Sequence, residues 1–340
     1  MKKYIYAAVS LLVVLAAIIF WPGSDSNSNE VDKIRIGYNA QSINSSVLSI
    51  ANKKGYFQNH GLNVEILPLK GGEEVRLALI AGQIDIGLAG LADIMPLLTG
   101  GVPIRIIAPA TAAPTYMFVR PGENIKTFQD LYGKTVLVST GGTNDLIWHA
   151  AMSKENIDIK KIKTVDVERA YRVTALMNQR LADAAVVAEQ DASALLEAGA
   201  VPMEEWEAKG YTHPVSRGSI IVNVDFMNKN EDLMNKFIDG YSDAHRLIKD
   251  DPYEAANIVV GQIREVSGGA INHSADVIRE QWTGGGLKNV IWEDPVSSMD
   301  LVVQGKLTGL IDRDLSMEEI YDLRFEDKLK SLQQEYDTQD

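Results

Sequence analysis

The feature that most constrains this fold is a regular alternation of strand-like and helix-like segments between Ile34 and Pro109. The segment 34–38 (IRIGY) alternates as a half-buried strand does, and 46–55 has helical apolar spacing with a closing glycine suited to a helix end. The alternation continues with a strand at 62–67 (LNVEIL), a helix at 71–82 (GGEEVRLALIAG) and a strand at 84–90 (IDIGLAG). This order predicts an α/β fold whose sheet is covered by helices and meets ligands at the carboxyl ends of its strands.

Length, charge and the absence of one residue type limit the possible partners and chemistry. A chain of 340 residues exceeds the usual size of a single core, so two lobes are expected. The net charge of −13 argues against a nucleic-acid partner, which would need a basic face. With no cysteine, the chain excludes disulfides, thiolate metal sites, a cysteine nucleophile and a lipid-modified N-terminal cysteine.

The first residues carry an export signal. Lys2 and Lys3 precede an uncharged run from Ile5 to Trp21, close to the lower length of about 17 residues that spans a bilayer. Residues 1–22 are predicted to be an uncleaved transmembrane anchor, because the region before Pro22 is bulky and has no small-x-small cleavage site. A signal peptide cleaved between residues 23 and 28 is the alternative. Residues 23–30 have the composition of a flexible linker.

Four phrases resemble one known family: IGYNAQS, KGYFQNHGLNVEI, GGEEVRLALIAGQIDIGLAG and GVPIRIIA. They are similar to the nitrate/sulfonate/taurine family of ABC-transporter substrate-binding proteins, which also includes binders of the thiamine pyrimidine precursor. The resemblance covers about 33–250. It implies a two-lobed clamp of the type II periplasmic-binding-protein fold. Such a clamp captures a small-molecule solute outside the membrane and delivers it to an ABC permease. No cofactor or metal is expected, and the clamp is expected to be a monomer.

The chain can be divided into lobes at two extended segments. Residues 115–120 (TYMFVR) and 219–226 (SIIVNVDF) are interpreted as the crossings between lobes. Lobe one is then predicted to hold residues 31–114 plus 219–340, and lobe two residues 115–218. The segment 78–93 resembles 175–192, which predicts one equivalent strand–helix unit in each lobe. The part after residue 228 is expected to pack on lobe one, and the tail after Ser316 to form a last amphipathic helix.

The strongest candidate for ligand contact is the loop STGGTND, between the strand TVLV and the helix that follows. Thr140 and Thr143 offer hydroxyls, while Gly141 and Gly142 allow backbone N–H groups to approach a ligand. The start of the helix adds free N–H groups and a partial positive charge. A simple capping turn, with Thr143, Asn144 or Asp145 as the cap, is the alternative. The loop has no P-loop pattern, so nucleotide hydrolysis is not supported.

Three other segments are candidates for the walls of the cleft. In LAGLAD, Gly90 and Leu91 begin a helix, although this can also be a tight turn that serves packing alone. The loop after the first strand offers Asn39, Gln41 and Ser42. In lobe two, Gln190 and the neighbouring Glu189 follow the strand AAVV. A carboxylate that points into the cleft there would disfavour a bare anion.

Two residues near these loops have competing interpretations. Arg217 is interpreted as a bidentate ligand of an anionic group or as one partner of a surface salt bridge. Trp148 can stack on a planar ligand or pack in the core.

The function predicted from these features is the binding of a small sulfonate-like or related anion. A heteroaromatic vitamin precursor is the alternative. An enzyme on the same fold is disfavoured, because the five histidines show neither a metal-ligand spacing nor a catalytic-triad pattern. A sensory domain is disfavoured because so few residues precede the anchor.

Overall fold

The computed structural model describes residues 33–166, 172–177, 180–212, 214–271, 273–284 and 287–338. From Ile34 onward the chain forms one compact unit. The predicted anchor at 1–22 and linker at 23–30 lie outside the described residues and stay predictions. Within the described ranges, no helix has both the length and the apolar character needed to cross a membrane.

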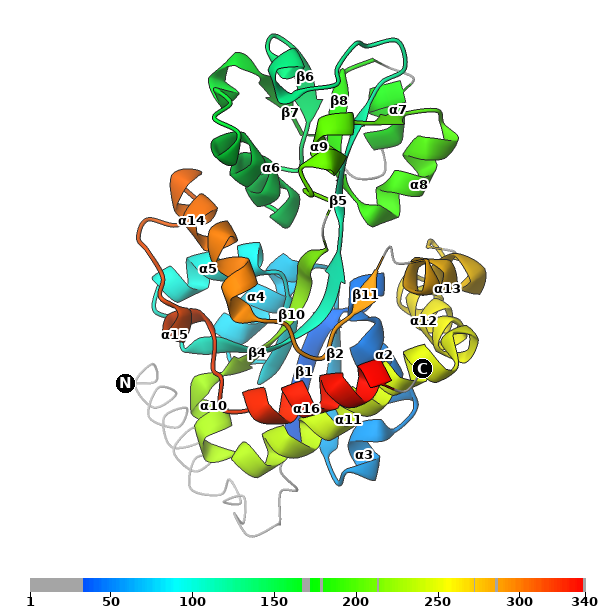
Figure 1. Ribbon diagram of the computed structural model, residues 1–340. Helices are drawn as coiled ribbons and strands as arrows, with labels where there is room; N and C mark the ends of the chain where they lie inside the picture. Colours follow the sequence, from blue (N-terminus) through cyan, green and yellow to red (C-terminus); the bar gives the residue numbers. More distant parts are fainter. Residues whose placement is uncertain are drawn as a thin grey trace, which may run out of the picture. The chain divides into compact units, whose positions relative to one another are not determined.

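The first sheet has six strands in the order β11-β4-β10-β3-β1-β2 (Figure 1). β1 and β3 pair in parallel, and β10 runs antiparallel to both β3 and β4. The predicted strands at 34–38, 62–67 and 84–90 are confirmed as β1, β2 and β3. The strands are β1 (Lys33–Asn39), β2 (Asn63–Leu69), β3 (Ile86–Ala89), β4 (Ile104–Ala113), β10 (Val215–Asn223) and β11 (Lys288–Asn289).

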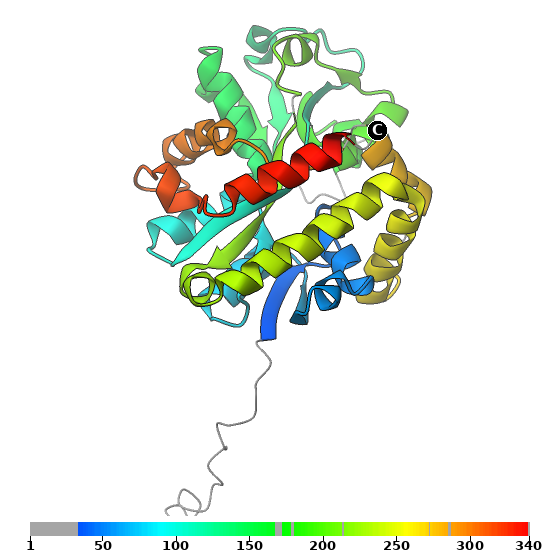
Figure 2. The same ribbon diagram turned by 60° about the horizontal axis from the view of Figure 1, so that its bottom comes forward.

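Helices cover both faces of this sheet, and we call the sheet with these helices the first lobe. Gly55 adopts φ +70° beyond the end of α2, so the glycine expected at that helix end is confirmed. The long helix α11 and the last helix α16 lie side by side (Figure 2). The helices are α2 (Ser46–Lys53), α3 (Tyr56–Asn59), α4 (Gly72–Ile80), α5 (Leu91–Thr99), α10 (Val224–Lys229), α11 (Glu231–Asp250), α12 (Pro252–Val266), α13 (Ala275–Thr283), α14 (Met299–Leu307), α15 (Met317–Ile320) and α16 (Glu326–Thr338).

The second sheet has five strands in the order β7-β6-β8-β5-β9, and with its helices it forms the second lobe. An α/β fold with two sheets is therefore confirmed. The strands are β5 (Thr115–Val119), β6 (Thr135–Leu137), β7 (Lys163–Val165), β8 (Ala184–Ala188) and β9 (Val201–Pro202). The helices are α6 (Thr143–Lys154), α7 (Arg172–Met177), α8 (Glu189–Glu197) and α9 (Glu204–Ala208).

The chain passes between the sheets at two places. β4 ends at Ala113 in the first sheet and β5 starts at Thr115 in the second, so a single residue, Pro114, separates them. On the return, β10 already pairs in the first sheet from Val215 onward. The boundaries at 114/115 and 218/219 stay predictions, while the strand pairing shows that residues 215–218 belong to the first sheet.

The C-terminal part departs from the sequence interpretation at one point. The tail after Ser316 was expected to form one helix, and that prediction is wrong because α15 and α16 are separate. Between them, Tyr321 forms a parallel bridge with Ile106 at the edge of β4, and the backbone N–H of Asp322 donates to Ile106 O at 2.9 Å. Backbone pairing with the sheet therefore interrupts a segment whose side-chain pattern is helical.

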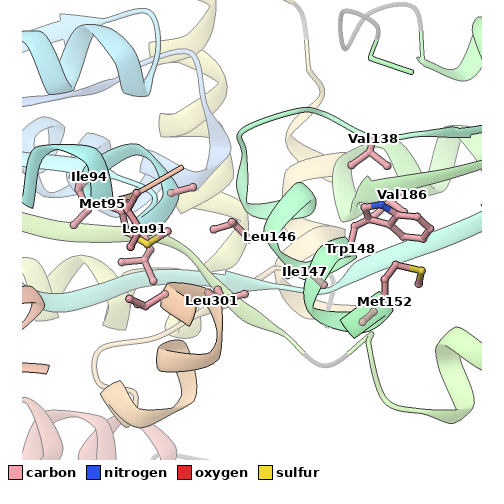
Figure 3. Packing of buried hydrophobic residues seen from close by; sticks show 14 of the residues in the cluster. Leu91, Ile94, Met95, Val138, Leu146, Ile147, Trp148, Met152, Val186 and Leu301 are labelled. Atoms are coloured by element: carbon pink, nitrogen blue, oxygen red, sulfur yellow. The ribbon is translucent and has the colours of Figure 1, made fainter. Parts of the chain in front are cut away.

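One apolar cluster includes residues of both lobes. Leu91 and Met95 of α5 and Leu301 of α14 belong to the same buried cluster as Leu146 and Ile147 of α6 (Figure 3). Burial of such side chains stabilises the structure by about 25 cal/mol per Å² of apolar surface. The contact of α6 with α5 and α14 therefore contributes to holding the two lobes together.

Candidate functional site

The loop that leads from β6 into α6 brings backbone amides to the edge of the second sheet. Gly141 adopts φ +76°, a conformation that favours glycine and lets the chain turn sharply before the helix. Gly142 is the N-cap residue, so the N-cap position itself offers no side chain to the helix amides. None of Thr143, Asn144 and Asp145 is therefore the N-cap residue. The start of this 12-residue helix carries a partial positive charge, with the Asp145 carboxylate in its first turn.

A cavity of about 190 Å³ lies at this helix start. One wall comes from the first lobe through Asn44, which follows β1, and Arg217, which lies in β10. The rest comes from the second lobe, at the end of β8 and the start of α6. The cavity is thus bordered by the ends of strands from both sheets. Its lining residues are Asn44, Ser139, Gly142, Thr143, Asn144, Ala188 and Arg217.

The two lobes approach each other closely beside this cavity. A Cβ atom built on Gly90, the N-cap of α5, would lie 3.5 Å from Thr143 Oγ1 in the second lobe. The same atom would lie 3.5 Å from the carbonyl oxygen of Arg217. Gly90 therefore lies next to Thr143, a residue that borders the cavity.

Arg217 is the charged residue of the cavity lining, and its side chain is half-buried. It donates from Nε to Ala113 O at 3.1 Å, from Nη1 to Asn144 Oδ1 at 2.7 Å, and from Nη2 to Pro114 O at 2.8 Å and to Thr115 Oγ1. Among the described residues no carboxylate lies within ion-pair distance of it, so the predicted surface salt bridge is not formed. Burial lowers the pKa of Arg217 to about 10, and the group remains a cation at neutral pH.

Thr140 and Gly141 are exposed, and their backbone amides are already engaged. The N–H of Thr140 donates to Asp166 Oδ2 at 3.1 Å, and that of Gly141 donates to Asp145 Oδ2 at 2.9 Å. A ligand would have to displace these carboxylates to reach either amide. Of the four residues predicted in this loop, Gly142 and Thr143 border the cavity.

The loop after the first strand lies on the opposite wall. Asn39 Oδ1 accepts from the backbone N–H of Gln41 at 3.1 Å, and Ser42 Oγ accepts from that of Asn44 at 3.2 Å. These bonds shape a short 3₁₀ turn, Ile43–Ser45, that brings Asn44 to the cavity. The predicted residues Asn39, Gln41 and Ser42 are half-buried around this turn.

Three candidates occupy other positions. Leu91 is buried in the apolar cluster that includes residues of α5 and α6, next to Gly90. Trp148 is fully buried in the same cluster, so core packing is its observed role (Figure 3). Gln190 and Glu189 lie in the first turn of α8. The predictions for these two side chains lie outside the described part of the chain.

Sequence reasoning did not select four of the lining residues: Asn44, Ser139, Asn144 and Ala188. Ser139 and Asn144 lie inside the STGGTND motif, and Asn44 lies in the polar loop NAQSINSS. The motifs therefore identified the segments that border the cavity but not these individual residues. Ala188 gave no chemical signal, because its contribution is its position at the end of β8.

Larger cavities lie elsewhere in the described structure. One of about 400 Å³ is bordered by the ends of α11, α13 and α16 together with β11. Another of about 360 Å³ lies between α6 and α14. Neither includes a residue of the predicted site. The cavity of about 190 Å³ at the start of α6 is the better candidate. It combines Arg217, which has no carboxylate partner among the described residues, with strand ends from both sheets.

Comparisons with known proteins identify the family of this chain and relatives of its fold. The model of the family described as NMT1/THI5 like matches residues 42–255, more than half of the chain. This confirms the resemblance found in the sequence. A provisionally named binding protein of Brucella abortus is 25% identical over 191 residues, which cover 53% of this chain and 54% of that protein. The chain therefore spans about half the length of the curated relatives it matches.

Two solved structures show the shared fold. The periplasmic aliphatic sulphonate binding protein SsuA of Escherichia coli superposes with a TM-score of 0.70 at 16% identity, over 85% of this chain and 92% of that one. The periplasmic nitrate-binding protein NrtA of Synechocystis PCC 6803 superposes with a TM-score of 0.57 at 16% identity, over 90% and 88% of the two chains. At these identities the likeness concerns the fold.

Proposed function

Because this chain belongs to the NMT1/THI5-like family, we propose that it is the extracytoplasmic solute-binding protein of an ABC importer. We propose that it binds a small sulfonate-like or related organic or inorganic anion between its two lobes. The fold that it shares with a sulphonate-binding and a nitrate-binding protein supports this class of solute.

The observation that carries the proposal is the environment of Arg217. A cation withdrawn from water loses hydration free energy, which hydrogen-bond acceptors restore in part and a nearby negative charge restores more fully. Here neutral oxygen acceptors surround the guanidinium, and the described residues provide no carboxylate partner. An anion in the adjoining cavity would supply the missing charge, helped by the start of α6, where the N-cap is the glycine Gly142.

The arrangement of the lining explains how binding would favour a closed clamp. Asn44 approaches the cavity from the first lobe, and Thr143 approaches it from the second. A solute that contacts both gains interactions that an open form lacks, so it shifts the population toward closure. The single residue between β4 and β5 gives the chain a short crossing, as hinge closure requires.

The cavity is suited to binding without turnover. Its lining contains no histidine, carboxylate or cysteine that could act as a general base or a nucleophile. We therefore propose that the solute leaves unchanged and passes to a permease in the membrane. An N-terminal anchor at 1–22 would keep the clamp close to that permease.

A heteroaromatic solute, such as a thiamine-pyrimidine-like precursor, is the second candidate. Asp145 and Asp166 place carboxylate oxygens at the loop before α6, where they accept backbone N–H groups. An amino group on a ring could compete for these acceptors, whereas a bare anion would be repelled by them. A zwitterionic or amino-substituted solute would place its anionic group near Arg217 and would reach these carboxylates only by extending beyond the cavity toward the loop.

A ligand screen tests the proposal. The full chain, purified in mild detergent, is heated in the presence of ethanesulfonate, nitrate, propionate or an aminopyrimidine, and hits are measured by calorimetry. The proposal predicts that ethanesulfonate raises the Tm further as its concentration rises, as mass action requires, and that it is recovered unchanged. Conversion of the compound would favour an enzyme. Stabilisation by the aminopyrimidine alone would favour the second candidate, and no response to any compound would overturn both.

A further inference from the structure

The donors of Arg217 can be counted. A guanidinium has five N–H groups and no acceptor. One N–H on Nε is directed to Ala113 O, both on Nη2 to Pro114 O and Thr115 Oγ1, and one on Nη1 to Asn144 Oδ1. A single N–H on Nη1 is left. The bidentate contact with an anion that the sequence suggested is therefore not available in this arrangement, because it requires two parallel donors.

These contacts fix the orientation of the Asn144 amide. The atom of Asn144 that lies 2.7 Å from Arg217 Nη1 must be the oxygen, since a guanidinium can only donate. Thr115 Oγ1, fully buried, accepts from Arg217 and donates to the same oxygen at 3.3 Å. Both bonds hold Oδ1 on the side of Arg217, which leaves the Nδ2 group as the free end of the amide. Asn144 itself borders the cavity.

We infer that Asn144 is the residue that contacts the solute at this wall, through Nδ2, and that Arg217 is a positioning residue that acts through it. The inference rests on the proposed solute-binding function. Because Oδ1 is held by a cation, the amide cannot turn around, and the Asn144 side chain offers the cavity only N–H donors. The cation also polarises the amide and strengthens its N–H groups. At this position the site accepts a solute oxygen or another acceptor and rejects an N–H donor.

The opposite wall provides a matched control. Asn44 borders the same cavity with the same side chain, but among the described residues no hydrogen bond or cation holds its side-chain amide, while its backbone N–H donates to Ser42 Oγ. Its side chain can therefore turn either its oxygen or its nitrogen toward a solute. Replacement of either asparagine by aspartate adds one negative charge to the cavity. Only at position 144 does it remove a donor whose orientation is fixed.

The test compares Asn144→Asp with Asn44→Asp by calorimetry, with ethanesulfonate as the probe. The carboxylate introduced at position 144 would still accept from Arg217, so the Tm of this variant should be at least that of the wild type. Its affinity should nevertheless fall at least tenfold further than that of Asn44→Asp, although Arg217 compensates its added charge. An equal or smaller loss at position 144 would overturn the role of Asn144.

A double-mutant cycle tests the role of Arg217. If Arg217 acts through Asn144, the combination of Arg217→Gln with the uncharged replacement Asn144→Ala should bind within about threefold of Asn144→Ala alone. If the fold-losses of affinity of the two single variants multiply in the double variant, Arg217 contacts the solute directly, and the positioning role is overturned. Arg217→Lys replaces Arg217→Gln in the cycle if the latter does not fold. A wild-type chain that binds none of the screened compounds would instead overturn the proposed function, and this inference with it.

Discussion

Two helix starts face each other where the lobes meet, and they are built alike. Each has a glycine at the N-cap and an aspartate three residues later, in Gly90–Asp93 of α5 and Gly142–Asp145 of α6. Asp93 Oδ2 accepts the N–H of Gly90 at 3.1 Å, and Asp145 Oδ2 accepts that of Gly141 at 2.9 Å. In each lobe an aspartate carboxylate thus accepts a hydrogen bond from one backbone N–H just before the first turn of the helix.

The difference lies in the two residues between glycine and aspartate. In α5 they are Leu91 and Ala92, both buried in apolar packing, while in α6 they are Thr143 and Asn144, which border the cavity. The same backbone geometry therefore serves packing in one lobe and, as we propose, solute contact in the other. A glycine-led helix start does not by itself mark a binding site, because the side chains of the first turn decide its role.

The largest expected effect is on the packing side of this contrast. Leu91→Ala removes a side chain that is 3% exposed from the cluster containing α5 and α6 residues, so it should lower the free energy of unfolding by about 2–5 kcal/mol. Urea unfolding at constant pH measures the change. A decrease in the unfolding free energy of less than about 1 kcal/mol would mean that the start of α5 does not serve packing. The proposed difference between the starts of α5 and α6 would then be wrong.

The contrast extends to the histidines of the two lobes. His245 of α11 is fully buried next to the Tyr241 ring, and burial lowers its pKa to about 3. In the unfolded chain the His245 imidazole becomes protonated below about pH 6.5, whereas in the folded chain it stays neutral until about pH 3. The contribution to stability is therefore lost as the pH falls through this window, by about 1.4 kcal/mol per pH unit, or about 2 kcal/mol at pH 5.

Replacement of this ring tests that expectation. His245→Phe should flatten the dependence of the unfolding free energy on pH between 5 and 6.5. His149→Gln, in the second lobe, is the matched control, because the His149 side chain is partly exposed and lies 3.5 Å from Asp145. A His245→Phe variant with the same slope as the wild type would show that this histidine does not make the first lobe acid-sensitive.

On the binding side, Thr143→Val should weaken the affinity for ethanesulfonate at least tenfold, about 1.4 kcal/mol, because it removes a hydroxyl from the cavity wall. Its Tm should stay close to that of the wild type, since Thr143 is only half-buried. Thr140→Val, three residues earlier at an exposed position, is the control and should change the affinity less than twofold. Equal losses of affinity in both variants, measured by calorimetry, would indicate that the solute binds at the loop before α6 and not at the helix start.

How far the sequence could predict this molecule depends on the range of each interaction. The strands and the longer helices between β1 and β4 follow from periodicity, which is local, and they were predicted, whereas the short helix α3 and the turn Ile43–Ser45 were not. The break between α15 and α16 was missed, because it depends on the pairing of Tyr321 with Ile106 far away in the chain. Asn144 was considered only as a cap, because the orientation of its amide is set by Arg217, 73 residues later. Contacts of this kind leave no spacing pattern in a single sequence.

The smallest expected effect concerns the aspartate of α5. Burial raises the pKa of Asp93, partly offset by the hydrogen bond from Gly90 N–H. The folded chain therefore holds this proton more tightly than the unfolded chain, and stability is lost as the pH rises from the ordinary value of 3.8 through the raised one. Asp93→Asn keeps an acceptor for Gly90 but cannot ionise. It should remove that loss of stability with rising pH and leave the unfolding free energy at pH 7 within about 1 kcal/mol of the wild type.

Asp145→Asn in α6 controls for the loss of a negative charge at a helix start. If Asp93→Asn destabilises the chain at pH 7 by much more than Asp145→Asn does, the buried carboxylate is needed in its charged form, and the α5 start is more than a packing element.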